Sequence, residues 1–197
     1  MTQRPLLLLD IDGVLNAFEA WGLVHGPLPR DGRQVPPSDG YRLTHANGWT
    51  LLIPADAQRW VGRLEAHFDV VWSTMWESDA VEHFAPVAGF GHTWSWIDFT
   101  SFEEEQLEQR SGNEVGHHKH AGIVATAGDR PVVVVDDDLA PLTRLWASFR
   151  EDEGIPTMTV KPDPAVGLTA ADVDAMIRFA GRVAAEQVAT PQPLVAG

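Results

Sequence analysis

Two short acidic motifs follow the most hydrophobic stretches of the chain. The run "LLLLDIDGVL" contains Asp10 and Asp12, and "PVVVVDDDLAP" contains Asp136 and Asp137. If these stretches are neighbouring strands of one sheet, the carboxylates converge. Two charges about 4 Å apart repel by about 4 kcal/mol at an effective dielectric of about 20. Because every candidate ligand is an oxygen atom, the pattern predicts a hard cation, and Mg²⁺ is its natural occupant.

A more ordinary interpretation is that these residues are turn or cap residues, since an isolated Asp after a strand commonly has that role. Two acidic motifs, each directly after a continuous apolar run, make this interpretation weaker. Gly13 follows the second aspartate of the first motif. A glycine has no Cβ, so Gly13 predicts that the backbone approaches a ligand closely there.

Two further segments could bind a phosphoryl group. "VVWSTMW" ends a predicted strand in the hydroxyls of Ser73 and Thr74, and "GHHKHAGI" places Lys119 at the start of a helix. A metal and a lysine offset the charge on phosphoryl oxygens, while hydroxyl and backbone N–H groups orient them. Each of these residues is a weak signal alone, because many strands end in Ser or Thr and most lysines are solvated.

The elements that must position these residues alternate along the chain. Five apolar runs predict buried parallel strands, at Pro5–Ile11, Phe68–Ser73, Trp94–Phe99, Pro131–Val135 and Pro156–Lys161. Helical patterns are present at Ala55–His67, Ser78–Ala85, Lys119–Ala127, Leu139–Arg150 and Thr169–Val188, and Thr169 with Asp172 resembles a capping box. The alternation predicts an α/β fold, a Rossmann-like doubly wound three-layer sandwich with five parallel strands. The first and fourth strands must be neighbours if the carboxylates are to meet.

We expect residues 1–189 to form a single domain, with 16–54 as an insertion and 190–197 as a disordered tail. The insertion is rich in Gly and Pro and ends in a predicted hairpin from Tyr41 to Ile53, with Asn47-Gly48 at the turn. The acidic segment 100–116 is predicted to be either a solvated helix or a mobile loop.

The composition limits the classes of partner. The net charge of −14 repels phosphate backbones in general, although a local cation could still hold a small phosphorylated ligand. No apolar run approaches the roughly 20 residues that span a bilayer, so we expect a cytoplasmic protein without a membrane partner. Zero cysteines exclude disulfides, thiolate zinc sites and cysteine nucleophiles. The oligomeric state is not indicated.

The order "DIDGVL", "VVWST", Lys119 and "VVVVDDD" resembles the haloacid dehalogenase-like (HAD) superfamily of phosphohydrolases over roughly residues 5–165. The resemblance implies that Asp10 is a nucleophile that forms an aspartyl-phosphate. It implies that Asp12 protonates the leaving oxygen and later activates water. True dehalogenases lack this second aspartate, so Asp12 points away from carbon–halogen chemistry.

The same resemblance implies roles for the remaining motif residues. Thr74 or Ser73 would bind the phosphoryl group, with Thr74 favoured, and Lys119 would hold both nucleophile and phosphate. Asp136 would bind Mg²⁺ together with Asp10 and the carbonyl of Asp12, with Asp137 assisting. Within the superfamily, "WSTMW" and the "DDD" ending resemble small domains related to RNA-repair proteins. The insertion is located where this superfamily places a cap and is too short for a helical cap domain, so we expect a β-hairpin flap or a minimal cap.

Tryptophans and histidines near the motifs allow further interpretations. Trp76, Trp94 and Trp96 follow strand ends and could line a pocket or stack on a base, although core packing is the more common role of tryptophan. Trp76 is the one we place among the substrate-binding residues. His117, His118 and His120 could bind a transition metal, but surface histidines near a phosphate site explain them better.

These patterns predict a Mg²⁺-dependent phosphomonoester hydrolase acting on a nucleotide or small phosphometabolite. One alternative is a metal- or phosphate-binding regulatory domain with little catalytic activity, since folds transfer more readily than activities. The other is a nucleic-acid end phosphatase, against which the negative charge argues.

Overall fold

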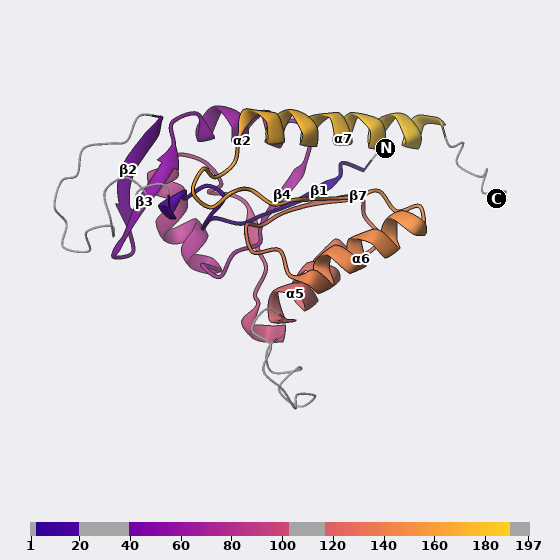
Figure 1. Ribbon diagram of the computed structural model, residues 1–197, viewed down its shortest axis with the longest axis horizontal. Coiled ribbons are helices and arrows are strands. Elements are labelled where there is room, and N and C mark those ends of the chain that lie inside the picture. The colour runs from indigo at the N-terminus through magenta and orange to yellow at the C-terminus, as the bar shows by residue number, and fades with distance from the viewer. Residues whose placement is uncertain (1–2, 20–39, 103–116, 190–197) are drawn as a thin grey trace.

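The computed structural model describes residues 3–19, 40–102 and 117–189. Its centre is a parallel five-stranded sheet in the order β5-β4-β1-β6-β7 (Figure 1). The strands are β1 (Leu6–Leu9), β4 (Asp69–Trp72), β5 (Ser95–Trp96), β6 (Val132–Val135) and β7 (Thr157–Val160). After β1 the chain adds β4 and β5 on one side, then crosses over to add β6 and β7 on the other. The predicted α/β fold is confirmed, and so is the adjacency of the first and fourth strands.

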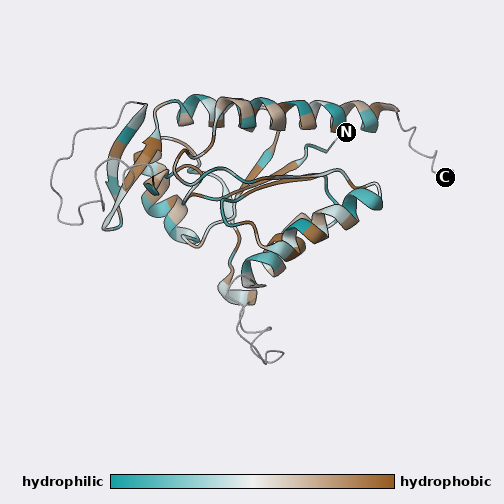
Figure 2. Ribbon diagram, viewed as in Figure 1, coloured by the Kyte–Doolittle hydropathy of each residue, from teal (hydrophilic) through white to brown (hydrophobic). Residues whose placement is uncertain are grey.

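Helices cover both faces of the sheet (Figure 1). The helices α2 (Ala57–Glu65) and α7 (Ala170–Ala189) lie on one face, and α5 (His117–Ala127) and α6 (Pro141–Asp152) lie on the other. Figure 2 shows hydrophobic strands between helices that carry hydrophilic residues. Because both faces are covered, the strands are continuous apolar runs rather than alternating ones.

The alternation of side chains along β1 divides the core in two. Leu7 and Leu9 belong to the cluster beneath α2 and α7, whereas Leu6 and Leu8 belong to the cluster beneath α5 and α6. All four are buried, with at most 2% of each residue exposed. Strand β1 is therefore fixed on both faces, and the residue that follows it has a defined position.

A two-stranded antiparallel hairpin, β2 (Tyr41–Ala46) and β3 (Trp49–Pro54), forms a second small sheet. Asn47 and Gly48 at its turn have φ angles of 47° and 77°, as a type I′ turn requires. The predicted hairpin is confirmed. Arg42 anchors the hairpin to the body by donating to the carbonyl of Val87 at 2.8 Å.

The helical segment after β4 differs from the prediction of one short α-helix at Ser78–Ala85. A π-helix, η1 (Ala80–Phe84), continues into α3 (Ala85–Ala88). Pro86 has no N–H to donate to the carbonyl four residues earlier, so the α-helical ladder is interrupted at this point. The helical pattern identified the segment but not its wider turn.

The last helix begins as predicted. Asp172 accepts hydrogen bonds from the backbone N–H and the hydroxyl of Thr169 at 3.0 and 2.6 Å, and its own N–H donates back to that hydroxyl at 3.3 Å. This is the reciprocal arrangement of a capping box. The expectations for the segment after Phe102 and for 190–197 lie outside the described residues. Among the helices within the described ranges, none is long and apolar enough to cross a membrane.

Candidate functional site

The centre of the candidate site is a pair of buried aspartates joined by one lysine. Asp10 follows β1 and Asp136 follows β6, with 4% and 3% of each residue exposed. The Nζ atom of Lys119, on α5, lies 2.5 Å from Oδ2 of Asp10 and 2.7 Å from Oδ2 of Asp136. The order of strands reverses between β1 and β6, and in open α/β sheets ligands bind beyond the carboxyl ends of the strands at such a point.

Asp137 completes a group of three carboxylates. One oxygen of Asp10, one of Asp136 and one of Asp137 all lie within 4.8 Å of one another. The Oδ1 atom of Asp136 also accepts the backbone N–H of Asp138 at 2.8 Å, which fixes the loop. One ammonium thus faces three carboxylates, and the donor set is entirely oxygen, so these residues fit a hard divalent cation.

The electrostatics of the group reflect this excess of negative charge. Burial, with a contribution from Asp136, raises the pKa of Asp10 to about 7 against the lowering effect of Lys119. Burial and then the charge of Asp136 raise the pKa of Asp137. The carboxylates in turn raise the pKa of Lys119 more than its burial lowers it, so Lys119 remains protonated. A bound cation would relieve the same repulsion.

Gly13 lies directly against the side chain of Asp137. Its φ angle is +69°, and a Cβ atom at this position would overlap the side chain of Asp137. Both observations favour glycine. The close approach at Gly13 therefore brings the loop after β1 against the third carboxylate of the group.

The carboxylate of Asp12 has separate partners. Its Oδ1 accepts Nδ2–H of Asn16 at 2.8 Å, and its Oδ2 accepts the indole Nε1–H of Trp76 at 2.9 Å. The group of three carboxylates does not include Asp12.

Asn16 is a site residue that the sequence reasoning missed. It is 4% exposed, and its Oδ1 accepts the N–H of Leu52, on β3, at 2.9 Å. The available signal was a single polar residue inside the apolar stretch "GVLNAF". A polar side chain at such a position is usually buried with hydrogen-bond partners.

Ser73 and Thr74 directly follow β4, the strand next to β1, and both are 1% exposed. The backbone N–H of Ser73 donates to the carbonyl of Leu9 at 2.9 Å, which places Ser73 beside Asp10 in the ladder. Its hydroxyl has no hydrogen-bond partner in the described part of the protein. The Thr74 hydroxyl accepts a long bond of 3.4 Å from the N–H of Trp76.

The three tryptophans have three different environments. Trp76 is half-buried and directs its N–H to Asp12. Trp94 lies in the core, 4.6 Å from Trp72 between ring centroids, and donates to Glu65 at 2.8 Å. Trp96 is 44% exposed on β5. Trp94 therefore packs mainly in the core, the more common role of tryptophan.

The histidine tract is only partly described. The Nδ1 atom of His120 lies 3.2 Å from the Thr143 hydroxyl, and its ring packs edge-on to Trp146 between α5 and α6. The side chains of His117 and His118 lie outside the described residues.

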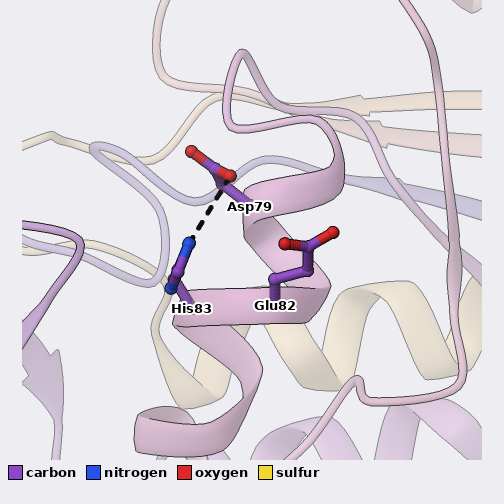
Figure 3. Close-up of side chains that lie close together, drawn as sticks. All are labelled: Asp79, Glu82 and His83. Carbon is purple, nitrogen blue, oxygen red and sulfur yellow. Dashed lines mark ion pairs between the residues drawn. The ribbon is translucent and has the colours of Figure 1, made fainter.

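A second group of potential metal ligands lies on and just before η1. Figure 3 shows Asp79 and His83 facing each other, with Glu82 beside them. One ligand atom from each lies within 4.8 Å of the others. Nε2 of His83 is 3.8 Å from Asp79, and Asn47 donates to Asp79 at 2.7 Å. Glu82 and His83 are exposed, unlike Asp10 and Asp136.

Comparison with known families gives a match over most of the chain. The family described as the HAD domain in Swiss Army Knife RNA repair proteins matches residues 6–173. Among curated proteins and solved structures, none matches this chain.

Proposed function

Because the chain belongs to the family of HAD domains found in Swiss Army Knife RNA repair proteins, we propose that it is a Mg²⁺-dependent phosphomonoester hydrolase that acts through Asp10. The family supports a phosphatase-like hydrolase. The observation that carries the proposal is the buried Asp10–Lys119–Asp136 arrangement, with Nζ 2.5 and 2.7 Å from the two carboxylates. This arrangement supports the proposal because it would place a nucleophile, Asp10, beside a cation and a third carboxylate, Asp137, at one edge of the sheet.

Asp10, Asp136 and Asp137 would hold the metal, with the carbonyl of Asp12. Bound there, Mg²⁺ would supply positive charge that polarises the phosphoryl oxygens and keeps Asp10 ionised. Lys119 already contacts Asp10 and would bind a phosphoryl oxygen alongside it. Ser73 would donate its unpartnered hydroxyl to the phosphoryl group, and this favours Ser73 over Thr74, which the resemblance alone favoured.

The reaction would follow two displacements. A carboxylate oxygen of Asp10 attacks phosphorus, the ester P–O bond breaks, and Asp12 gives its proton to the leaving alkoxide. Asp12, now ionised, takes a proton from water as the water oxygen attacks the aspartyl-phosphate. The acyl phosphate P–O bond breaks, inorganic phosphate leaves, and both aspartates return to their initial states.

The proposed substrate is a nucleotide or a small phosphometabolite. The net charge of −14 argues against long polyanions, whose affinity depends on many phosphate contacts. Exposed Trp96, at 44%, offers an apolar ring near the carboxyl edge of the sheet, and stacking on such a ring contributes about 1–3 kcal/mol per base.

A second candidate substrate is a phosphorylated RNA end. The family description, which names RNA repair proteins, is the observation that favours it. A single terminal phosphate would need fewer backbone contacts than a long duplex, so the chain's negative charge opposes it less strongly.

A phosphate-release panel tests the proposal and separates the substrates. The panel contains mononucleotides, sugar phosphates, and oligonucleotides with 3′- or 5′-phosphates, each with Mg²⁺ and with EDTA. We expect Mg²⁺-dependent release that is fastest with a small ester. Oligonucleotides that exceed every small ester by a wide margin would establish the RNA-end function instead. Mg²⁺ binding without turnover of any ester would favour a regulatory domain.

A further inference from the structure

The Asp12 carboxylate is held at both of its oxygens by neutral donors from two separate segments. Asn16 donates to Oδ1 at 2.8 Å, and the indole of Trp76 donates to Oδ2 at 2.9 Å. Each carboxylate oxygen has two lone-pair sites. One accepted hydrogen bond per oxygen fixes the plane of the carboxylate and leaves a second site on each oxygen for a proton.

The orientation of the Asn16 amide is determined by the hairpin. Leu52 N–H is a donor only, and it lies 2.9 Å from Oδ1 of Asn16. The oxygen of the amide must face this donor, so its NH₂ group must face Asp12. The N–H of Ala17 also donates to the carbonyl of Leu52 at 2.9 Å, which closes the contact between the β1 loop and β3.

The position of Trp76 is fixed by packing against the core. Its ring packs edge-on to Phe84, with centroids 6.1 Å apart and an interplanar angle of 66°. Phe84 is itself fully buried in the core. The indole N–H therefore reaches Asp12 from a ring whose position is set by packing.

We propose that Asn16 and Trp76 are positioning residues for proton transfer by Asp12, and that Asn16 makes the orientation of this carboxylate depend on docking of the β2–β3 hairpin. This inference rests on the proposed function. A misplacement of about 1 Å in a reacting group can cost about 100-fold in rate. Loss of the donors thus affects the transfer of a proton to the leaving oxygen more than it affects substrate binding.

Substrates that differ in leaving group test the proposal. An alkyl phosphate needs a proton on its departing oxygen, whereas a nitrophenyl phosphate releases a stable phenolate without one. The parameter is kcat/KM, because it reports only the steps up to departure of the leaving group. We expect Asn16→Asp to lower kcat/KM about 100-fold for the alkyl ester and only about threefold for the aryl ester. Trp76→Phe should show the same asymmetry with a smaller loss.

Matched controls are available in the same chain. Gln58→Glu makes the same amide-to-acid change at an exposed position of α2, where the amide donates to the carbonyl of Gly89 at 3.3 Å, and Trp60→Phe removes an indole N–H that has no partner in the described structure. Neither control should change the ratio of the two kcat/KM values. Equal losses on both esters, or no loss in Asn16→Asp, would overturn the proposal.

A spectroscopic measurement separates this proposal from the proposed function. The indole N–H resonance of Trp76 is identified as the one that disappears in Trp76→Phe. We expect it to shift in Asp12→Ala and in Asn16→Asp, and to remain in place in Gln58→Glu. An unmoved resonance in Asp12→Ala would overturn the positioning role. A shifted resonance in a protein that hydrolyses no ester would overturn the proposed function and leave the hydrogen-bonded arrangement supported.

Discussion

Two groups of side chains in this molecule place three potential metal ligands within 4.8 Å of one another. The first, Asp10 with Asp136 and Asp137, follows two central strands, and two of its members are at most 4% exposed. The second, around Asp79, lies on the surface at the start of η1, where Glu82 and His83 are exposed (Figure 3).

The two groups differ in the free-energy cost of leaving their carboxylate charges without a partner. Water screens the charges around Asp79, and an exposed ion pair typically contributes only about 0–1 kcal/mol. At the strand ends, burial raises the pKa of Asp10 to about 7, and a single lysine faces three carboxylates. Proximity of ligands is therefore common to both groups, and only the buried group has an electrostatic need for a cation.

The largest predicted effect comes from removing the lysine of the buried group. Lys119→Met leaves the buried carboxylates of Asp10 and Asp136 without their partner. Breaking a buried ion pair in this way costs about 3–5 kcal/mol, and we expect that loss in the free energy of unfolding at neutral pH in EDTA. Denaturant unfolding measures it.

The control for this variant is the other lysine of the chain, Lys161, which is exposed after β7. Lys161→Met should change the free energy of unfolding by no more than about 0.5 kcal/mol. Similar losses in the two variants would show that the buried group is not electrostatically distinct.

A smaller effect should follow the addition of Mg²⁺. At a concentration 100 times its Kd, the ion should stabilise the protein by about 2.7 kcal/mol. Asp137→Asn should reduce the increase in Tm, and Asp79→Asn should not, as thermal unfolding can show. An increase in Tm that depends on Asp79 instead would reverse the assignment of the two groups.

The effect of Mg²⁺ should also depend on pH. In the metal-free protein the pKa of Asp10 is about 7, above its ordinary value of 3.8. The folded state therefore binds this proton more tightly than the unfolded chain does. The resulting stabilisation is complete below about pH 3.8 and is lost as the pH rises through about 7. The Tm difference between Mg²⁺ and EDTA should accordingly grow across this range, and a constant difference would contradict the assignment.

The smallest effect distinguishes the two adjacent hydroxyls. Ser73→Ala removes a buried hydroxyl that has no protein partner, and we expect it to raise KM about tenfold, since a hydrogen bond to a charged group contributes about 1.5–3 kcal/mol. Thr74→Val should raise KM less. A larger increase in Thr74→Val would return the phosphoryl-binding role to Thr74.

The fold could be predicted from the sequence because its signals are local. Continuous apolar runs such as Val132–Val135 identify strands buried on both faces, and the two acidic motifs require β1 and β6 to be neighbours. The Asn47-Gly48 turn is equally local, since its positive φ angles suit these two residue types.

The detailed arrangement around Asp12 could not be predicted in this way. The Asp12 carboxylate accepts a hydrogen bond from Asn16. The orientation of the Asn16 amide is determined by the N–H of Leu52, 36 residues later in the chain. Position 13 favours glycine because a Cβ atom there would overlap the side chain of Asp137, a residue in the loop after β6. Partners that come from separate segments leave no periodic or local pattern in the sequence.

Replacing one aspartate in each group and measuring Mg²⁺-dependent phosphate release from an aryl phosphate tests whether Asp10 is the nucleophile. Asp10→Asn exchanges the nucleophile for a poor one of nearly the same shape, and circular dichroism checks that the fold is retained. We expect Asp10→Asn to lower turnover by more than about 1,000-fold, while Asp79→Asn keeps the wild-type rate. A folded Asp10→Asn protein that retains the wild-type rate would show that Asp10 is not the nucleophile.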